Sequence, residues 1–471
     1  MADRAPPLWT AQDIAQAVEG RIEGGTFAAS GVGYNSKEIR PGDLFVALKG
    51  ARDGHDFAAG AFAAGAAGAL VERPVEGGPC IVVDDTQKAL ERLGAAARDR
   101  APHVRRGAVT GSVGKTGVTQ AIKAGLDLAG PAHASIKSYN NHIGVPLTLS
   151  RMAETVERAV FEIGMNAPGE IAPLSHMVQP HAACVTTVGP VHIEAFDDGE
   201  AGVAREKAAI FAGLGPGGVA VVNGDIVWEP LLRQAALHFG ARVVTFGSAA
   251  EHDARLIDFR AEGEGARLIA EVWGRTHVFT LRQSGFHWGL NSLAVILMLD
   301  ALDVPVELAL QALADFQPLS GRGQSRTVRI AGGAFTLIDE SYNANPLSMA
   351  AGFTNLAARD VGRGRRVLVL SDMLELGDQS RALHQGLAAA IDAAGLDVVH
   401  AAGPEMRAMY EALRPERRGV WAATAAELAE QVETLVQPGD LVMVKGSNGS
   451  RASLVAAALA DLERRLDLSE G

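Results

Sequence analysis

The sequence predicts an α/β protein built from three domains, which we expect over residues 1–103, 104–318 and 319–471. The chain has 471 residues, about three times the usual length of a single domain. Short apolar runs alternate with longer runs of helical periodicity, which is typical of parallel sheets covered by helices. A glycine-rich segment, residues 111–116, stands between a strand-like run and a helical run. This segment makes the second domain the expected nucleotide-binding unit.

Composition excludes some classes of protein. Hydrophobic residues make up 48% of the chain and charged residues 21%, as in globular rather than disordered proteins. The chain has 55 acidic and 43 basic residues, so its net charge of −12 gives no preference for nucleic acid or for an anionic membrane surface. Cys80 and Cys184 lack metal-site spacing, which favours a reducing compartment. Because residues 1–10 lack an export signal, we expect a cytoplasmic protein.

The first domain begins with a helix signature, with Thr10 as its N-cap. Residues 41–43 form a Pro-Gly-Asp turn that leads into a buried strand at 44–48. The apolar stretch 57–71 is too short to span a bilayer, and we expect a buried helix there. The polar loop 50–57 could contact a ligand, and an ordinary surface loop explains it equally well.

The second and third domains follow the alternation of strand and helix. In the second domain a strand-like stretch at 256–281 precedes a helix near His287, and polar residues follow the strands, where open α/β sheets bind ligands. The third domain lacks a Gly-x-Gly-x-x-Gly fingerprint, so a dinucleotide site is not predicted. The expected strands cover residues 158–163, 182–188, 219–223, 243–246, 335–338, 367–370, 398–401 and 441–444. The expected helices of the third domain cover residues 347–358, 380–394 and 453–466.

A phosphate-binding loop is predicted at Gly111, Ser112, Val113, Gly114, Lys115 and Thr116. Its glycines let backbone N–H groups face phosphate oxygens, and the helix that follows adds a partial positive charge. Lys115 can reach the β- and γ-phosphates, and the Thr116 hydroxyl can hold Mg²⁺. The longer form of the motif would have glycine at position 109, where this chain has valine. Gly-Lys-Thr also occurs by chance in solvated turns, so the neighbouring strand and helix matter to the prediction.

Three further polar residues have two interpretations each. Glu162 ends an apolar strand, and His192 lies in a loop after another strand. A carboxylate suits Mg²⁺ and an imidazole suits a second, more tolerant metal position. A strand-end glutamate is, however, often only solvated, and a loop histidine is more often hydrogen-bonded. Lys207, taken alone, is one more exposed helix lysine, so these residues leave kinase, ATPase and ligase chemistry open.

The series of motifs resembles the Mur ligase family. The resemblance covers nearly the whole chain, with the motifs in order and at fitting spacings. Asn-Asn-x-x-Gly-Val-Pro at 140–146 and Glu-Ser-Tyr-Asn-Ala-Asn-Pro at 340–346 are similar to segments of the members that add a dipeptide. The matching segments are 110–116, 139–149, 161–171, 285–287 with Asn291, 321–323, 338–346, 372–377 and 445–447.

The resemblance implies a role for each matched residue. The catalytic residues would be Lys115, His192 and Lys207. Two Mg²⁺ ions would be held by Thr116, Glu162, His192 and Lys207, the last as a carbamate formed with CO₂. ATP would contact the phosphate loop, Asn291, Arg322, Asp339 and Glu340. The UDP-sugar-peptide would contact Ser36, Lys37, Asn140 and Asn141, and the incoming dipeptide would contact Tyr342, Asn343 and Asn345.

The resemblance also implies an activity, the ATP-dependent ligation of an acid to a D-amino acid. D-Alanyl-D-alanine would join UDP-N-acetylmuramoyl-tripeptide through an acyl phosphate in peptidoglycan synthesis. The three domains would be a UDP-binding α/β domain, a P-loop ATPase-like domain and a Rossmann-like domain in a monomer without nucleic-acid or membrane partners. Alternatives are a related ligase with another acceptor and a non-catalytic nucleotide-binding regulator. The chain departs from the family pattern at 35–37, Gly117, Ala209 and Phe286.

Overall fold

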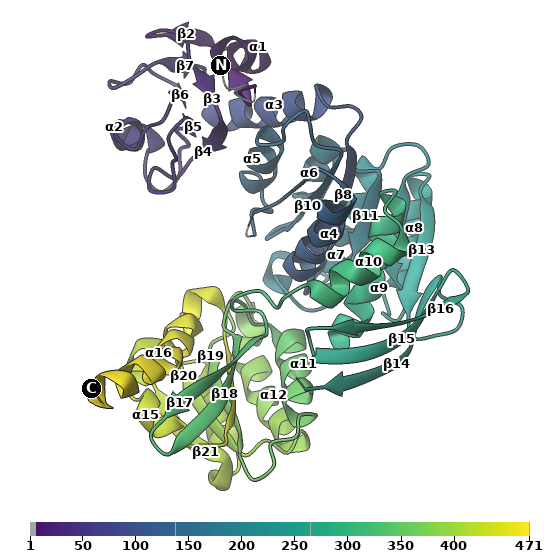
Figure 1. The fold of residues 1–471 in the computed structure, drawn as a ribbon, viewed down its shortest axis with the longest axis vertical. Coiled ribbons are helices and arrows are strands. Elements are labelled where there is room, and N and C mark those ends of the chain that lie inside the picture. The colour runs from purple at the N-terminus through teal and green to yellow at the C-terminus, as the bar shows by residue number, and fades with distance from the viewer. Residues whose placement is uncertain (1–5, 137, 264, 471) are drawn as a thin grey trace.

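The computed structural model describes residues 6–136, 138–263 and 265–470, so residues 1–5 of the predicted first domain lie outside it. Three sheets, each with its own hydrophobic core, follow one another along the long axis of the molecule (Figure 1). The predicted α/β fold class is confirmed. Among the described helices, none combines the length and the apolar character that a membrane span needs.

The N-terminal unit contains a five-stranded sheet in the order β2-β7-β6-β5-β4. Its strands are β2 (Arg21–Glu23), β4 (Gly31–Gly33), β5 (Asp43–Val46), β6 (Gly68–Val71) and β7 (Cys80–Val82), and a two-stranded ribbon joins β1 (Trp9–Thr10) to β3 (Ala28–Ala29). Helix α1 (Ala11–Val18) begins, as predicted, at Thr10, which forms a capping box with Asp13. Helix α3 (Thr86–Asp99) covers the sheet and packs against α5 (Gly144–Ser150).

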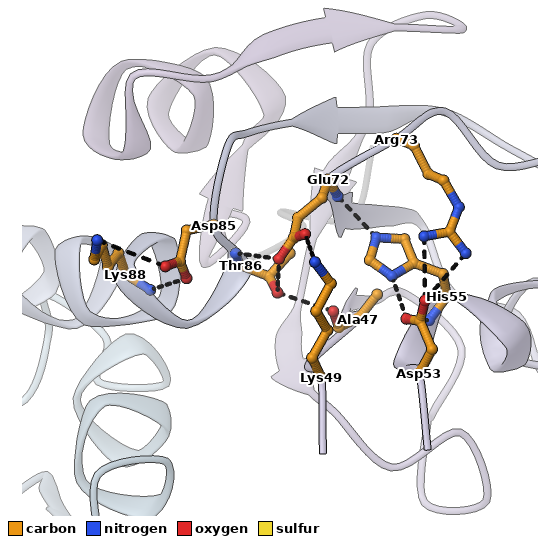
Figure 2. A network of polar contacts seen from close by, with 9 residues as sticks. All are labelled: Ala47, Lys49, Asp53, His55, Glu72, Arg73, Asp85, Thr86 and Lys88. Atoms are coloured by element: carbon orange, nitrogen blue, oxygen red, sulfur yellow. Dashed lines mark hydrogen bonds and ion pairs between the residues drawn. The ribbon is translucent and has the colours of Figure 1, made fainter. Parts of the chain in front are cut away.

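One prediction for this unit was wrong, and another was wrong in its extent. The stretch 57–71 is not one helix, because α2 (Ala58–Ala63) ends before Gly65, whose φ of +97° lets the chain turn into buried strand β6. The loop predicted at 50–57 is shorter than expected, because residues 54–57 form the 3-10 helix η1 (Gly54–Phe57), in which His55 is buried (Figure 2). The His55 imidazole donates to Asp53 over 2.6 Å and accepts the Glu72 N–H at 2.8 Å, which ties this segment to the end of β6.

The central sheet has nine strands in the order β16-β15-β14-β13-β12-β11-β8-β10-β9. Strands β8 (Arg105–Thr110), β9 (Ala132–Ala134), β10 (Arg158–Glu162), β11 (Ala182–Val185), β12 (Val219–Asn223) and β13 (Arg242–Gly247) are parallel. The stretch 256–281 extends the same sheet as β14 (Ala254–Glu262), β15 (Gly265–Val272) and β16 (Arg275–Leu281), with β15 antiparallel to both neighbours.

Helices cover both faces of the central sheet because alternate strand residues point to opposite sides. Val109 faces the core formed with α4 (Lys115–Ala129), α9 (Phe286–Ala301) and α10 (Val306–Asp315). Ala108 faces the core formed with α5, α6 (Ile171–Val178), α7 (Glu200–Ala208) and α8 (Glu229–His238). The loops after the parallel strands therefore meet at one edge of the sheet, as the sequence predicted.

The C-terminal unit has a six-stranded sheet in the order β17-β18-β22-β19-β20-β21. Its strands are β17 (Gln324–Ile330), β18 (Gly333–Glu340), β19 (Arg366–Ser371), β20 (Val398–Ala402), β21 (Arg418–Ala422) and β22 (Leu441–Lys445). One face carries α11 (Pro346–Ala357), α12 (Ser380–Ala393) and α13 (Met406–Ala412), and the other carries α14 (Ala425–Ala429), α15 (Val432–Leu435) and α16 (Ala452–Glu470). Strands β17 and β21 and helices α13 to α15 were not predicted.

Candidate active site

The predicted phosphate loop has the backbone of an anion cradle. It joins β8 to α4, and both glycines have a left-handed φ, +150° at Gly111 and +86° at Gly114. A Cβ added to Gly111 would stand 1.9 Å from Thr186 Oγ1, and one added to Gly114 would stand 3.2 Å from Asn291 Nδ2. Only glycine fits at these positions, and Asn291 lies beside the loop as the sequence implied.

One serine hydroxyl joins the loop to the C-terminal unit. Ser138 Oγ lies 3.3 Å from Thr116 Oγ1, and it accepts hydrogen bonds from Arg322 Nη2 at 3.1 Å and from Tyr342 Oη at 2.9 Å. The Arg322 guanidinium also lies over the Tyr342 ring, 4.0 Å from its centroid. The structure therefore brings three predicted site residues from two domains to a single point.

Lys115 and Arg322 form a positive pair at this point. Within the described residues neither has a carboxylate partner in an ion pair, and Lys115 Nζ donates instead to Gly111 O at 2.7 Å. Burial lowers the pKa of Lys115, and the Arg322 charge lowers it further while Glu162 opposes them. Lys115 in the phosphate loop and Arg322 beside it repel each other. A bound polyphosphate would relieve this repulsion, so the arrangement suits such a ligand.

Glu162 has the geometry expected of a cation ligand. Its side chain is 1% exposed, and Oε1 accepts a hydrogen bond from Asn140 Nδ2 at 2.6 Å, while Oε2 is buried and meets no hydrogen-bond partner among the described residues. A carboxylate oxygen of this kind is costly to bury unless a cation or a donor meets it. Nowhere in the described chain do three or more His, Cys, Asp or Glu side chains gather to hold a metal, so a cation at Glu162 would need other oxygen ligands as well. Hydroxyl and carboxylate oxygens completed by substrate phosphates suit Mg²⁺.

His192 contacts the C-terminal unit. It has a left-handed backbone, with φ +54°, and its Nδ1 lies 2.8 Å from Glu375 Oε2. Burial lowers the pKa of His192. The Glu375 charge raises it in part, and the charges of Lys115 and Lys207 lower it further. The imidazole is therefore neutral near pH 7, as a metal ligand must be.

Lys207 is not the exposed helix lysine that its position alone suggested. It lies near the end of α7 and is 2% exposed, and within the described residues its one hydrogen-bond contact is Met165 Sδ at 3.6 Å. The neighbouring Glu206 is committed elsewhere, because it accepts the N–H groups of Gly169 and Ile171. Burial lowers the pKa of Lys207 well below its ordinary value, and the Lys115 charge lowers it further.

Asp339 and Glu340, the two acidic residues expected to meet ATP, have partners within the C-terminal unit. Asp339 Oδ1 accepts hydrogen bonds from Ser341 N at 3.0 Å and from Ser341 Oγ at 2.5 Å. Glu340 Oε2 lies 3.0 Å from Lys445 Nζ, and Lys445 also donates to Asn343 O at 3.2 Å. Burial acts to raise the pKa of Glu340, and the Lys445 charge reverses this and lowers it.

A pocket of about 120 Å³ opens beside His192, between the central and C-terminal units. Asn343 and Asn345 line it, which supports their grouping by sequence. Asn345 is at the same time the N-cap of α11, with Oδ1 2.9 Å from Ser348 N. The other lining residues are Val191, Ala344, Leu374, Glu375, Leu376, Ser447, Asn448 and Gly449.

Three family models match the chain in order, and they are described as the Mur ligase family catalytic domain (residues 28–116), the Mur ligase middle domain (109–299) and the Mur ligase glutamate ligase domain (323–448). The UDP-N-acetylmuramoyl-tripeptide–D-alanyl-D-alanine ligase of Bacillus subtilis is 33% identical over 463 residues, which cover 96% of this chain and 98% of the relative. The chain belongs to the Mur ligase family.

Solved structures support the same assignment. This Mur ligase matches MurF from Acinetobacter baumannii with a TM-score of 0.84 and 30% identity, over 96% of this chain and 99% of the other. It matches MurF from Thermotoga maritima in complex with ADP with a TM-score of 0.77 and 25% identity, over 93% of this chain and 98% of the other. The three-unit architecture is thus that of the family.

The predicted UDP-substrate residues lie along the contact between the first two units of this Mur ligase. Ser36 and Lys37 follow β4, and the Lys37 N–H donates to Asn35 Oδ1 at 3.2 Å. Beside them the Tyr34 and Tyr139 rings lie 6.2 Å apart, so the first unit meets the segment that carries Asn140. Asn141 Oδ1 accepts the Gly144 N–H at 2.9 Å at the start of α5, which gives Asn141 a structural role as well.

Sequence reasoning missed two residues of the site. Ser138 and Glu375 join the central and C-terminal units: Ser138 lies just outside the matched segment 139–149, and Glu375 lies within the matched segment 372–377 but was given no role. One departure from the family pattern has a structural reason: a Cβ added to Gly117 would stand 3.0 Å from the Trp288 ring, so Trp288 occupies the space that a side chain would need. Phe286 is exposed and packs edge-on against Phe259, with 5.6 Å between ring centroids.

Proposed function

We propose that this Mur ligase joins D-alanyl-D-alanine to UDP-N-acetylmuramoyl-tripeptide with ATP, giving ADP and phosphate, in the synthesis of the peptidoglycan precursor. The relatives that span its whole length carry this activity in their names. The observation that carries the proposal is the approach of Arg322, from the third domain, to the phosphate loop: Arg322 donates to Ser138 Oγ beside Thr116, and its charge acts on Lys115. That arrangement serves phosphoryl transfer to a substrate held between domains.

The reaction needs no side-chain nucleophile. The tripeptide carboxylate attacks the γ-phosphorus of ATP, the bond to the β-phosphate oxygen breaks, and an acyl phosphate and ADP form. The dipeptide amine then attacks the acyl carbon, the C–N bond forms, and phosphate leaves. Negative charge moves between oxygens in both steps, so Lys115 and Arg322 contribute by fixed positive charge. Contact between the central and C-terminal units excludes water from the acyl phosphate.

Mg²⁺ would be held by Thr116 and Glu162 at one position and by His192 at a second. The buried Glu162 Oε2, for which the described residues offer no hydrogen-bond partner, supports the first position. The neutral imidazole of His192 supports the second. When bound, Mg²⁺ neutralises phosphate charge and orients the γ-phosphate.

We also propose that Lys207 is carbamylated. An ammonium beside divalent cations is repelled, whereas CO₂ adds to a neutral amine and leaves a carboxylate on a long stem. Three observations support a neutral amine: the burial of Lys207, its lowered pKa, and the lack of an oxygen partner for its amine within the part of the chain that the structure describes. Lys207→Ala should be nearly inactive and should recover part of its activity with added short-chain carboxylic acids. Full activity without them would contradict the carbamate.

The substrates occupy different parts of the chain in this proposal. The UDP end lies on the first domain, residues 1–103, near Ser36 and Lys37 and close to Asn140 and Asn141. ATP lies on the second domain, residues 104–318, with Asn291 at the adenine. The third domain, residues 319–471, supplies Arg322 to the phosphates and Asp339 or Glu340 to the ribose and its surroundings. The dipeptide enters the cavity beside His192, where Asn343 and Asn345 are, with Tyr342 close to the phosphates.

We propose that this Mur ligase works in the cytoplasm. Both cysteines are free and buried, and burial raises the pKa of the Cys184 thiol, which keeps it unreactive. A protein with such thiols needs no oxidising environment.

The decisive experiment measures ADP release with UDP-N-acetylmuramoyl-tripeptide, with and without D-alanyl-D-alanine. ADP should form at full rate only when both are present, and Lys115→Ala should abolish it. Turnover with another amine but not with D-alanyl-D-alanine would favour a related ligase. ATP binding without turnover on any acceptor would favour a regulator.

A further inference from the structure

The loop that carries His192 lies between two domains. On the central side, Ser112 Oγ of the phosphate loop donates to Gly189 O at 3.0 Å and accepts from Gly189 N at 2.9 Å. On the C-terminal side, a Cβ added to Gly189 would stand 1.9 Å from Leu347 Cδ1 of α11. Residues 189–192 therefore contact both the phosphate loop and the C-terminal unit.

Glu375 meets this loop from the turn between β19 and α12. Its Oε2 lies 2.8 Å from His192 Nδ1, and both residues have a left-handed backbone, with φ +62° at Glu375 and +54° at His192. Such a conformation is strained for residues with a side chain and persists only where the surroundings hold it. Gly377 approaches the same loop, because a Cβ added there would stand 2.9 Å from Glu194 Cβ. Two turns from different domains thus fit against each other at the imidazole.

We propose that Glu375 is a positioning residue for His192. A carboxylate only accepts hydrogen bonds, so the neutral imidazole must present Nδ1–H to Glu375, and its lone pair is then on Nε2. A histidine that binds a metal commonly donates its other N–H to a carboxylate, which fixes the ring and makes it a stronger ligand. This role rests on the proposed function, in which His192 holds one of two cations.

Glu375 belongs to the C-terminal unit, whereas His192 belongs to the central unit, so cation binding at His192 should depend on contact between the two units. The His192 cation site is complete only when that unit lies against the loop. The reciprocity of linked equilibria then requires that domain contact strengthens cation binding and that the cation strengthens domain contact to the same extent. The other cation site, with Thr116 and Glu162, is built from the central unit alone and lacks this dependence.

Mn²⁺ binding to the full chain, measured by electron paramagnetic resonance with a non-hydrolysable ATP analogue present, tests the role. Glu375→Ala should weaken the His192-dependent Mn²⁺ by about 10- to 100-fold and leave the other Mn²⁺ unchanged. Because the Glu375 side chain is 59% exposed, its truncation removes little packing. Glu375→Gln keeps an oxygen that can accept from Nδ1–H and should lose less affinity than Glu375→Ala.

Glu194→Ala is the matched control. It removes an exposed carboxylate of the same loop that contributes charge but no hydrogen bond to the imidazole, so it should change Mn²⁺ affinity by no more than about twofold. If Glu194→Ala and Glu375→Ala lose the same Mn²⁺ affinity, the positioning role of Glu375 is overturned, because the loss then reflects only the removal of a nearby negative charge. In ¹⁵N spectra of histidine-labelled protein, the His192 ring should carry its proton on Nδ1 in the wild type and lose that preference in Glu375→Ala.

His192→Ala separates this inference from the function on which it rests. If His192→Ala keeps both Mn²⁺ ions, the metal assignment in the proposed function fails. If His192→Ala loses one Mn²⁺ while Glu375→Ala binds both as tightly as the wild type, only the positioning role is overturned.

Discussion

Replacing Lys207 by methionine should make this Mur ligase more stable and inactive. Methionine has nearly the length of lysine and would pack beside Met165 without an amine to desolvate. Lys207 is 2% exposed and its amine meets only the weak acceptor Met165 Sδ, and a buried donor that is poorly satisfied costs about 1–3 kcal/mol. For a domain of about 200 residues, each kcal/mol raises the unfolding midpoint by roughly 2–4 °C. Calorimetry in CO₂-free buffer should therefore show a clearly higher midpoint for Lys207→Met.

The stability gain should depend on pH and on CO₂. Burial lowers the folded-state pKa of Lys207, so between that pKa and the unfolded value of about 10.4 the unfolded chain binds the extra proton. The stability of the wild type therefore rises with pH over this range. The amount by which Lys207→Met is more stable than the wild type should shrink towards pH 10. In the presence of Mg²⁺ and an ATP analogue, added bicarbonate should raise the stability of the wild type further but not that of Lys207→Met, because methionine cannot form a carbamate. A variant that is less stable than the wild type in CO₂-free buffer, or that retains turnover, would refute this reasoning.

Three other substitutions test separate parts of the structure. Lys115→Ala should abolish ADP release but leave UDP-substrate binding, followed by calorimetry, nearly unchanged; near-normal turnover would contradict the phosphate-loop assignment. Asn345→Ala should lower the free energy of unfolding by about 0.5–2 kcal/mol through loss of the α11 cap, and an unchanged urea midpoint would contradict that role. His400 accepts the Val420 N–H and donates to Leu435 O, and burial lowers its pKa from 6.5 to about 4. Stability should therefore fall as pH drops from 6.5 to 4, by on the order of 3 kcal/mol, and His400→Gln should flatten this dependence in urea titrations.

The sequence alone was sufficient for the parts of the protein that depend on neighbours along the chain. The strand, glycine loop and helix at 105–129 follow from apolar periodicity and from two glycines at fixed spacing, and the structure has them there. Most of the buried parallel strands of the two large sheets, such as β10, β12 and β19, were predicted because such strands are short apolar runs, whereas β9, β17 and β21 were not. The stretch 57–71 was mistaken for one helix because alanine and glycine favour neither state strongly, and only pairing with β5 and β7 makes 68–71 a strand.

The tertiary structure decided which polar residues meet. Nothing local distinguishes Lys207 from a solvated lysine, yet the packing of α7 buries it. Ser138 and Glu375 acquire partners only because the C-terminal unit lies against the central one, at Arg322, Tyr342 and His192. Secondary structure follows from periodicity within a segment, whereas contacts between residues more than a hundred positions apart depend on how whole sheets and helices pack, and one sequence carries no periodic signal for that.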